Sequence, residues 1–231
     1  MAGLLIQAAV FDFDGLILDT ETAEFDACRL MFEHFGARLP LSAWAVCIGT
    51  RGAFDPYAHL QEQAGPGIDL AAARELRLRL FRERMAGKTA RPGVTDYLAD
   101  ARRLGLRIGL ASSSDRSWVV EHLERLGLLP HFECIRTADD VERVKPEPDL
   151  YLRVLEHFGV PGERAVAFED SPNGAAAAVR AGMPCVVVPN RLTARLPFPD
   201  GIRLRLASMA DMPLPAVLRR LESGAAAPSP G

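Results

Sequence analysis

The chain has 231 residues, of which 48% are hydrophobic and 25% are charged, and its formal net charge is -3. This is the composition of an ordinary globular protein, long enough for one large domain or a core domain with a smaller insert. The small negative charge excludes the basic surface typical of nucleic-acid-binding proteins, and no apolar stretch is long enough to span a membrane.

We therefore expect a soluble, cytoplasmic protein with neither a nucleic-acid partner nor a membrane partner. The N-terminal segment MAGLLIQAAV is apolar but has no basic leader, so it predicts a buried strand and not a signal peptide. The cysteines are far apart and form no CxxC pair, which favours buried thiols in a reducing compartment over disulfides or a zinc site. They are Cys28, Cys47, Cys134 and Cys185.

The first predicted strand, Leu4–Phe13, is followed by a segment, residues 19–91, that has helical patterns and no convincing strand. The helices predicted in this segment are Thr22–Phe35, Ala53–Gln63 and Leu70–Met85. The last of them contains RELRLRLFRERM, whose five arginines we interpret as a solvated helix face. The segment reads as a helical subdomain inserted after the first strand.

Beyond Arg91–Pro92–Gly93, short apolar runs alternate with helical patterns. The further predicted strands are Leu106–Ala111, Glu133–Arg136, Ala165–Phe168 and Cys185–Val188. The helices between and after them are Val94–Leu104, Arg116–Leu126, Leu150–Phe158, Gly174–Ala181 and Met209–Leu221. Apolar strands alternating with helices predict an α/β fold with a doubly wound parallel sheet. We expect residues 1–18 and 92–222 to form this core, residues 19–91 the insert and residues 223–231 a disordered tail.

Polar residues follow the predicted strands, at the sheet edge where ligands bind in open α/β folds. Asp12 and Asp14 end the first strand, at a spacing that puts both side chains on one side of an extended segment, and Gly15 permits a turn after them. Helix-capping aspartates in a turn remain an alternative interpretation. A buried carboxylate pair is costly unless a cation such as Mg²⁺ offsets the charge.

Ser112, Ser113 and Ser114 follow the second strand, where a hydroxyl and backbone amides can bind phosphate at a helix N-terminus. Ordinary N-capping is the alternative.

Lys145, in VKPEPDLY, is one of only two lysines in the chain, the other being Lys88. Lys145 could neutralise phosphate charge and keep Asp12 ionised, although a surface lysine before a helix would have the same sequence.

Glu169 and Asp170 end another apolar strand, directly before Ser171 and Pro172. Ser171 and Pro172 fit a helix cap and a first helical turn. Capping does not explain two successive acidic residues at the end of a buried strand, where their mutual repulsion is unfavourable unless a cation is near.

In this order the segments FDFDG, LASSS, VKPEPD and FEDSPNG resemble the four motifs of the haloacid dehalogenase-like hydrolase superfamily. The resemblance covers nearly the whole chain. The block DFDGLILDTE, with a helical insert after it, is similar to the subgroup that has a small α-helical cap and includes phosphoglycolate phosphatase-like enzymes and β-phosphoglucomutase.

The resemblance implies that Asp12 is the nucleophile and becomes an aspartyl-phosphate, and that Asp14 is the general acid and base. It also implies that Ser112 and Lys145 hold the phosphoryl group, with Ser113 as a further substrate-binding candidate. The metal ligands that it implies for Mg²⁺ are Asp12, the backbone carbonyl of Asp14 and Asp170, with Glu169 either as a further ligand or as a partner that orients the ligands. The side chain of Asp14 should then point away from the metal and toward the substrate.

The expected function is Mg²⁺-dependent hydrolysis of a small phosphomonoester metabolite, which could be a sugar phosphate. A β-phosphoglucomutase-like mutase is the main alternative; it would need cations on the insert for a second phosphate. Thr50, Arg51 and Lys88 are candidates for substrate binding by position alone, and surface polar residues would look the same; Arg51 and Lys88 could also form the second phosphate site. Counted without gaps from Asp12, the position of the mutase's hinge histidine is Glu24 in this chain. Relative to the shared glycine, Gly49, Arg51 lies one place earlier than the arginine of the mutase's cap loop. Both departures weaken the mutase interpretation. A dehalogenase or phosphonatase is disfavoured because those relatives lack an acid at Asp14, and a catalytically dead binding module because every motif acid is intact.

Overall fold

The protein, described by a computed structural model over residues 6–223, is built on one six-stranded parallel sheet. Its strand order, β3-β2-β1-β4-β5-β6, runs outward in both directions from β1, which confirms the predicted α/β fold. The strands are β1 (Ala8–Phe11), β2 (Arg107–Ala111), β3 (Cys134–Arg136), β4 (Ala165–Glu169), β5 (Cys185–Val187) and β6 (Ile202–Arg205). Residues 224–231 of the predicted disordered tail lie outside the described residues.

Helices cover both faces of this sheet, because alternate residues of its central strands are apolar on both sides. In β1, Ala9 and Phe11 belong to the core on one face, while Ala8 and Val10 belong to the core on the other. The helices on the first face are α5 (Val94–Arg103), α6 (Arg116–Arg125) and α9 (Leu214–Glu222). Those on the second face are α7 (Asp149–Phe158) and α8 (Pro172–Arg180).

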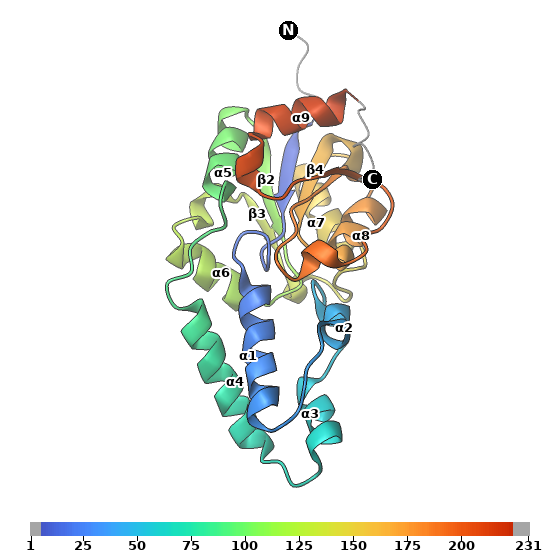
Figure 1. The fold of residues 1–231 in the computed structure, drawn as a ribbon. Helices are drawn as coiled ribbons and strands as arrows, with labels where there is room; N and C mark the ends of the chain where they lie inside the picture. Colours follow the sequence, from blue (N-terminus) through green and yellow to red (C-terminus); the bar gives the residue numbers. More distant parts are fainter. Residues whose placement is uncertain (1–5, 224–231) are drawn as a thin grey trace.

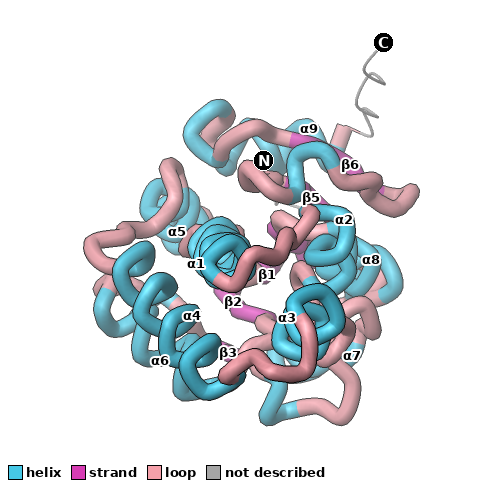
Figure 2. The backbone as a smooth tube through the Cα atoms, turned by 60° about the horizontal axis from the view of Figure 1, so that its bottom comes forward, coloured by secondary structure: helices cyan, strands magenta, loops and turns pink. Residues whose placement is uncertain are grey.

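Residues 19–91, here called the cap segment, form a separate helical layer beyond the carboxyl end of the sheet (Figure 1). Its α-helices are α1 (Thr20–His34), α2 (Leu41–Trp44), α3 (Pro56–Ala64) and α4 (Leu70–Met85). With the bottom of the molecule turned forward, these helices lie in front of the strands (Figure 2). A cluster of apolar side chains, including Phe32 and Leu60, lies mostly within the segment. The division into a core and a cap remains our interpretation of this arrangement.

The two chain connections between the core and the cap segment lie side by side. The Arg91 backbone N–H donates to the carbonyl of Ile17 at 2.8 Å, and Lys88 Nζ lies 3.1 Å from Asp19 Oδ2. Gly93 has a φ of 85° and faces the backbone of Met209, so a side chain at this position would be both strained and blocked. The two connections between the core and the cap segment are therefore joined to each other by a hydrogen bond and an ion pair.

Several element boundaries differ from the sequence prediction. Within the described residues the first strand is Ala8–Phe11, and Leu4 and Leu5 of the predicted strand lie outside them. The predicted helix Met209–Leu221 is divided at Pro213, because a proline cannot continue the preceding turn. The strand β6 was not predicted, because it lies at the sheet edge and buries only Leu204 well. The four-residue helix α2 was also not predicted.

None of the helices between residues 6 and 223 has both the length and the apolar character needed to cross a bilayer.

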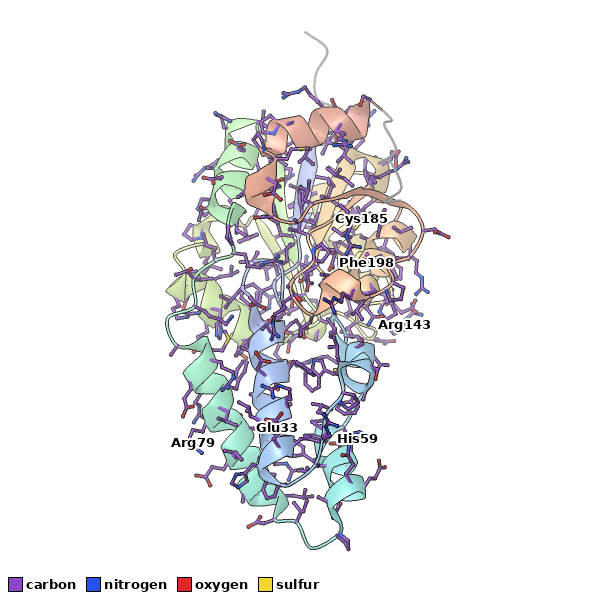
Figure 3. The ribbon with its side chains drawn as sticks, viewed as in Figure 1. Glu33, His59, Arg79, Arg143, Cys185 and Phe198 are labelled. Atoms are coloured by element: carbon purple, nitrogen blue, oxygen red, sulfur yellow. The ribbon has the colours of Figure 1, made fainter. Side chains whose placement is uncertain are left out.

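The charged side chains of the cap segment are not all solvated. Arg79 lies on the outer side of α4, as the sequence predicted for all five arginines of this helix (Figure 3). Arg77 differs, because it turns toward α1 and pairs with Glu24. The interpretation of the arginine-rich helix as a solvated face is therefore wrong for Arg77.

Candidate active site

Three carboxylates meet at the carboxyl end of the sheet. Asp12 directly follows β1, Glu169 is the last residue of β4, and Asp170 comes next. Because β1 and β4 are neighbouring parallel strands with Phe11 opposite Phe168, their ends are adjacent. One oxygen from each of the three carboxylates lies within 4.8 Å of the others, and all three residues are buried.

Lys145 supplies positive charge to this cluster. Its Nζ atom lies 2.5 Å from Asp12 Oδ1 and 2.7 Å from Glu169 Oε1, and the residue is only 1% exposed. Tyr151 on α7 donates its hydroxyl to the same Glu169 oxygen at 2.6 Å. Burial by itself would lower the pKa of Lys145, but the charges of Asp12 and Glu169 outweigh burial and raise it. Lys145 therefore carries its positive charge at neutral pH.

The cluster fits a divalent cation. Three carboxylates face one lysine, so two negative charges are left over when all are ionised. Burial raises the pKa values of Asp12 and Asp170 well above their ordinary range. Asp170 Oδ2 accepts a hydrogen bond from Asn190 Nδ2 at 2.7 Å, whereas its buried Oδ1 has no hydrogen-bond partner. Carboxylate oxygens are ligands that Mg²⁺ prefers, and a cation would satisfy both the charge and the orphaned oxygen.

The backbone around the cluster has no room for side chains. A Cβ atom on Gly15 would overlap with Asp170 Oδ2, and one on Gly174 would overlap with the Glu169 carboxylate. Gly15 also has a φ of 89°. These two glycines of the FDFDG and FEDSPNG motifs therefore allow the turn after β1 and the start of α8 to approach the carboxylates closely. Ser171 caps α8 as predicted, accepting a hydrogen bond from the Gly174 N–H at 3.1 Å.

The Asp14 carboxylate lies outside this cluster and takes different partners from those of Asp12. Its Oδ1 accepts hydrogen bonds from Thr20 Oγ1 and Trp118 Nε1, both at 2.9 Å. Its Oδ2 accepts from Ser112 Oγ at 3.3 Å and Ser114 Oγ at 2.6 Å. Both oxygens of this carboxylate therefore act as hydrogen-bond acceptors, each from two side-chain donors.

Asp14 lines a cleft of about 360 Å³ between the core and the cap segment. This volume lies within the range of roughly 300–1,000 Å³ that small-molecule sites occupy. The core side chains of the cleft are Asp14, Ser114, Asp115 and Trp118. The side chains from the cap segment are Thr20, Glu21, Glu24, Arg51, Arg77, Leu78 and Phe81.

The structure brings the core-motif candidates together but separates some of the others. Ser113 is buried, and its hydroxyl donates to the backbone carbonyl of Gly49 at 3.1 Å. Arg51 lies at the rim of the cleft and makes two hydrogen bonds to Asp115, of 2.8 and 2.6 Å. Lys88 pairs with Asp19 and lines other hollows of the surface.

Sequence reasoning missed the side chains that shape the cleft. Glu24 and Arg77 form an ion pair between α1 and α4, and Arg77 Nε also donates to the Tyr57 hydroxyl at 2.7 Å. Trp118 lies in the first turn of α6, where its N–H reaches Asp14. No local signal identifies these partners, because each contact joins segments that are distant in the chain. The sequence indicates only that α1 begins directly after Asp19 of the DFDGLILDTE block, which places its first turn near the motif residues.

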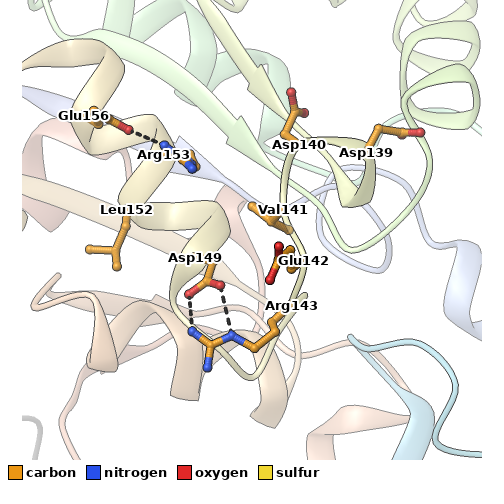
Figure 4. Close-up of a pocket in the computed structure, with 9 residues that line it drawn as sticks. All are labelled: Asp139, Asp140, Val141, Glu142, Arg143, Asp149, Leu152, Arg153 and Glu156. Carbon is orange, nitrogen blue, oxygen red and sulfur yellow. Dashed lines mark hydrogen bonds and ion pairs between the residues drawn. The ribbon is translucent and has the colours of Figure 1, made fainter.

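A larger hollow, of about 860 Å³, lies elsewhere on the core surface (Figure 4). Its lining is mostly acidic, and its arginines are paired: Arg143 with Asp149, and Arg153 with Glu156. The hollow contains neither a carboxylate–lysine pair like that of Asp12 nor any residue of the three-carboxylate cluster. Size alone therefore does not identify the reactive site.

Comparison with known proteins gives concordant results. Residues 9–188 match the family described as haloacid dehalogenase-like hydrolase. The chain is 51% identical over 219 residues to YhcW of Bacillus subtilis, a protein named as a candidate phosphatase, covering 95% of this chain and 99% of that protein. It is 31% identical over 189 residues to a phosphorylated carbohydrates phosphatase of Thermotoga maritima, covering 77% and 82%. The crystal structure of CbbY from Rhodobacter sphaeroides in complex with phosphate superposes with a TM-score of 0.69 at 31% identity, covering 89% and 96%.

Proposed function

Since the chain belongs to the haloacid dehalogenase-like hydrolase family, we propose that it is a Mg²⁺-dependent phosphatase of small phosphomonoester metabolites that acts through an aspartyl-phosphate on Asp12. The buried ion pair between Asp12 and Lys145, inside a cluster with excess negative charge, carries the proposal. Lys145 favours the ionised form of Asp12 against the effect of burial on its pKa, and a carboxylate paired in this way is positioned to attack phosphorus. The phosphate complex of CbbY and the name of the Thermotoga maritima relative support a phosphorylated substrate.

In the first half-reaction, an Asp12 carboxylate oxygen forms a bond to phosphorus while the ester bond between phosphorus and the leaving oxygen breaks. Asp14 gives a proton to that oxygen, so the product departs as an alcohol. Lys145 keeps Asp12 in place and, with Ser112, stabilises the charge that spreads over the phosphoryl oxygens.

In the second half-reaction, water attacks the phosphorus of the acyl phosphate. Asp14, now ionised, takes a proton from this water, and the bond between phosphorus and Asp12 breaks. Inorganic phosphate leaves and the Asp12 carboxylate is restored. The place of Asp14 in the lining of the cleft, outside the three-carboxylate cluster, supports its role as the group that exchanges protons with the leaving oxygen and with water.

Asp12, Glu169 and Asp170, with the backbone carbonyl of Asp14, are the groups proposed to hold Mg²⁺. When bound, this ion would neutralise the excess negative charge of the cluster and let a phosphate dianion approach Asp12. Glu169 also accepts hydrogen bonds from Lys145 and Tyr151. It contributes to the site either as a ligand of the ion or by holding these two side chains in place. We place the reaction in the cytoplasm, in keeping with the four cysteines being free thiols.

The proposal is tested by incubating the purified protein with Mg²⁺ and a panel of phosphorylated metabolites while measuring inorganic phosphate. We expect phosphate release that EDTA abolishes. Acid quenching during turnover, followed by peptide mass spectrometry, should place a phosphoryl group on Asp12. Activity that survives thorough chelation, or a phosphoryl group on another residue, would contradict the mechanism.

The mutase alternative requires a second phosphate site on the cap segment. Both of its candidate cations are bound to carboxylates, Arg51 to Asp115 and Lys88 to Asp19. We therefore expect release of inorganic phosphate and no efficient conversion of β-glucose 1-phosphate to glucose 6-phosphate, even when the reaction is primed with the bisphosphate. Isomerisation much faster than phosphate release would favour the mutase.

A further inference from the structure

Both arginines that line the cleft are bound to carboxylates of the same cleft. Arg77 on α4 pairs with Glu24 on α1, and Arg51 forms two hydrogen bonds with Asp115. Within the part of the chain that the structure describes, no other lysine or arginine lines this cleft. A second anionic group on a bound substrate would therefore find no free cation there.

The remaining charged groups of the cleft would repel such an anion. Asp14 and Glu21 also line it, so four carboxyl groups face two basic ones, and Glu21 adds its charge as the pH approaches about 8, because burial raises its pKa to about 8. The Gly49 N–H lies 3.4 Å from a Glu21 oxygen, and no basic side chain in the described residues pairs with Glu21. A second anion brought beside these carboxylates meets like charges, which disfavours such a ligand.

The same cleft is well suited to a neutral polyol. The carboxyl groups of Glu21 and Glu24 can accept hydrogen bonds from hydroxyls, and the Thr20 hydroxyl is within the same lining. Phe81 and Trp118 form an apolar wall, with ring centroids 5.8 Å apart and planes tilted by 33°. A hydroxylated carbon chain could place its C–H groups against this wall and its O–H groups toward the carboxylates.

We propose that Glu24, by holding Arg77, is a specificity-determining residue that restricts the enzyme to phosphomonoesters whose remaining part is neutral and hydroxylated. Esters with a second phosphate or a carboxylate are excluded. The pair is partly buried, with side chains 26% and 21% exposed for Glu24 and Arg77. Removing one partner of such a pair leaves the other unpaired, so Arg77 without Glu24 would become a site for a second anion. This inference rests on the proposed phosphatase activity.

The first experiment needs only the wild-type protein with Mg²⁺. It compares kcat/KM within matched pairs: glycerol 1-phosphate with 3-phosphoglycerate, glucose 6-phosphate with 6-phosphogluconate, and fructose 6-phosphate with fructose 1,6-bisphosphate. We expect the neutral member of each pair to be preferred by at least about tenfold, because the anionic member brings a like charge to the cleft. Higher salt should reduce this preference.

The second experiment assigns the preference to a residue. Glu24→Gln should raise kcat/KM for the anionic members relative to the neutral ones by about tenfold or more, because Arg77 is then unpaired. Asp115→Asn should act in the same direction through Arg51. Glu62→Gln is the matched control, since Glu62 is an exposed glutamate of the cap segment that does not line the cleft. It should leave every ratio unchanged.

The outcomes separate this inference from the proposed function. If the anionic members are used as well as the neutral ones, or if neither Glu24→Gln nor Asp115→Asn changes the ratios, the inference is wrong and the phosphatase remains. The wild-type comparison decides the matter even if Glu24→Gln does not fold. Absence of phosphate release from every ester, p-nitrophenyl phosphate included, would overturn the proposed function itself.

Discussion

Two regions of the molecule differ in how their charges are paired. At the carboxyl ends of β1 and β4, three buried carboxylates share a single lysine. In the cleft between the core and the cap segment, each arginine has a carboxylate of its own. The first region holds charge that is not balanced within the protein, and one buried oxygen of Asp170 has no partner. In the second region both arginines are neutralised by carboxylates, Asp14 and Glu21 lie beside these pairs, and the region is open to solvent.

This difference separates chemistry from selection. Unbalanced buried charge is costly to the folded protein and is retained where a ligand will complete the balance, in this case a cation and a phosphoryl group. Balanced pairs at a half-exposed mouth bind no charged ligand strongly, but they decide which neutral or charged groups can enter beside the phosphate. The two regions should therefore respond differently to substitution.

The largest expected effect is in the unbalanced region. Asp12→Asn should lower kcat by about 10,000-fold or more, because the amide keeps the shape of the side chain but is not a nucleophile. The melting temperature in metal-free buffer should not fall, because Lys145 keeps its ion pair with Glu169 while the excess negative charge of the cluster is reduced. Phosphate release and thermal unfolding are the measurements. Asp200→Asn, at an exposed position, is the control; near-normal activity of Asp12→Asn would refute the central assignment.

Metal dependence should be the next largest effect. Asp170→Ala should raise the Mg²⁺ concentration for half-maximal activity by roughly 100-fold, since a carboxylate ligand is lost. Asn190→Ala should have a smaller effect in the same direction, because it removes only the hydrogen bond to Asp170 Oδ2. Mg²⁺ titrations of activity test both. An unchanged Mg²⁺ requirement in Asp170→Ala would place the metal elsewhere.

The same contrast explains what the sequence could predict. The sheet and its reactive residues follow from local signals: apolar strands, then Asp12, Ser112, Lys145 or Glu169 directly after a strand or before a helix. Parallel strands bring those positions to one edge without further information. The cleft has no such rule. Arg77 meets Glu24 only because α4 packs along α1, and Trp118 meets Asp14 only because α6 starts beside the turn after β1.

A pH-dependent effect is expected in the cleft from Glu21. Burial, followed by the negative charge of Asp14, raises its pKa to about 8. In the unfolded chain a glutamate has a pKa of about 4.3, so the folded chain binds this proton more tightly. Its contribution to stability is complete below about pH 4.3 and is lost as the pH rises toward about 8. Relative to Glu21→Gln, the wild type should therefore lose thermal stability as the pH rises from about 5 to about 8.

Melting temperatures of both proteins, measured across this pH range in the presence of EDTA, test the prediction. Glu62→Gln provides the control, because Glu62 is exposed and far from Asp14 in the chain. A difference between wild type and Glu21→Gln that stays constant with pH would show that Glu21 titrates alike in the folded and unfolded chains.

The smallest effect is expected where the cap segment and the core are joined by charge alone. Arg51 and Asp115 are 46% and 53% exposed, so solvent screens their attraction despite the two short hydrogen bonds. A double-mutant cycle of Arg51→Ala and Asp115→Ala should give a coupling free energy of unfolding below about 1 kcal/mol, falling further at high salt. A pair this weak can open when a cap moves and close again around a substrate. A coupling free energy of several kcal/mol that persists in high salt would instead show that the pair holds the cap segment firmly against the core. That result would count against a cap that opens during turnover.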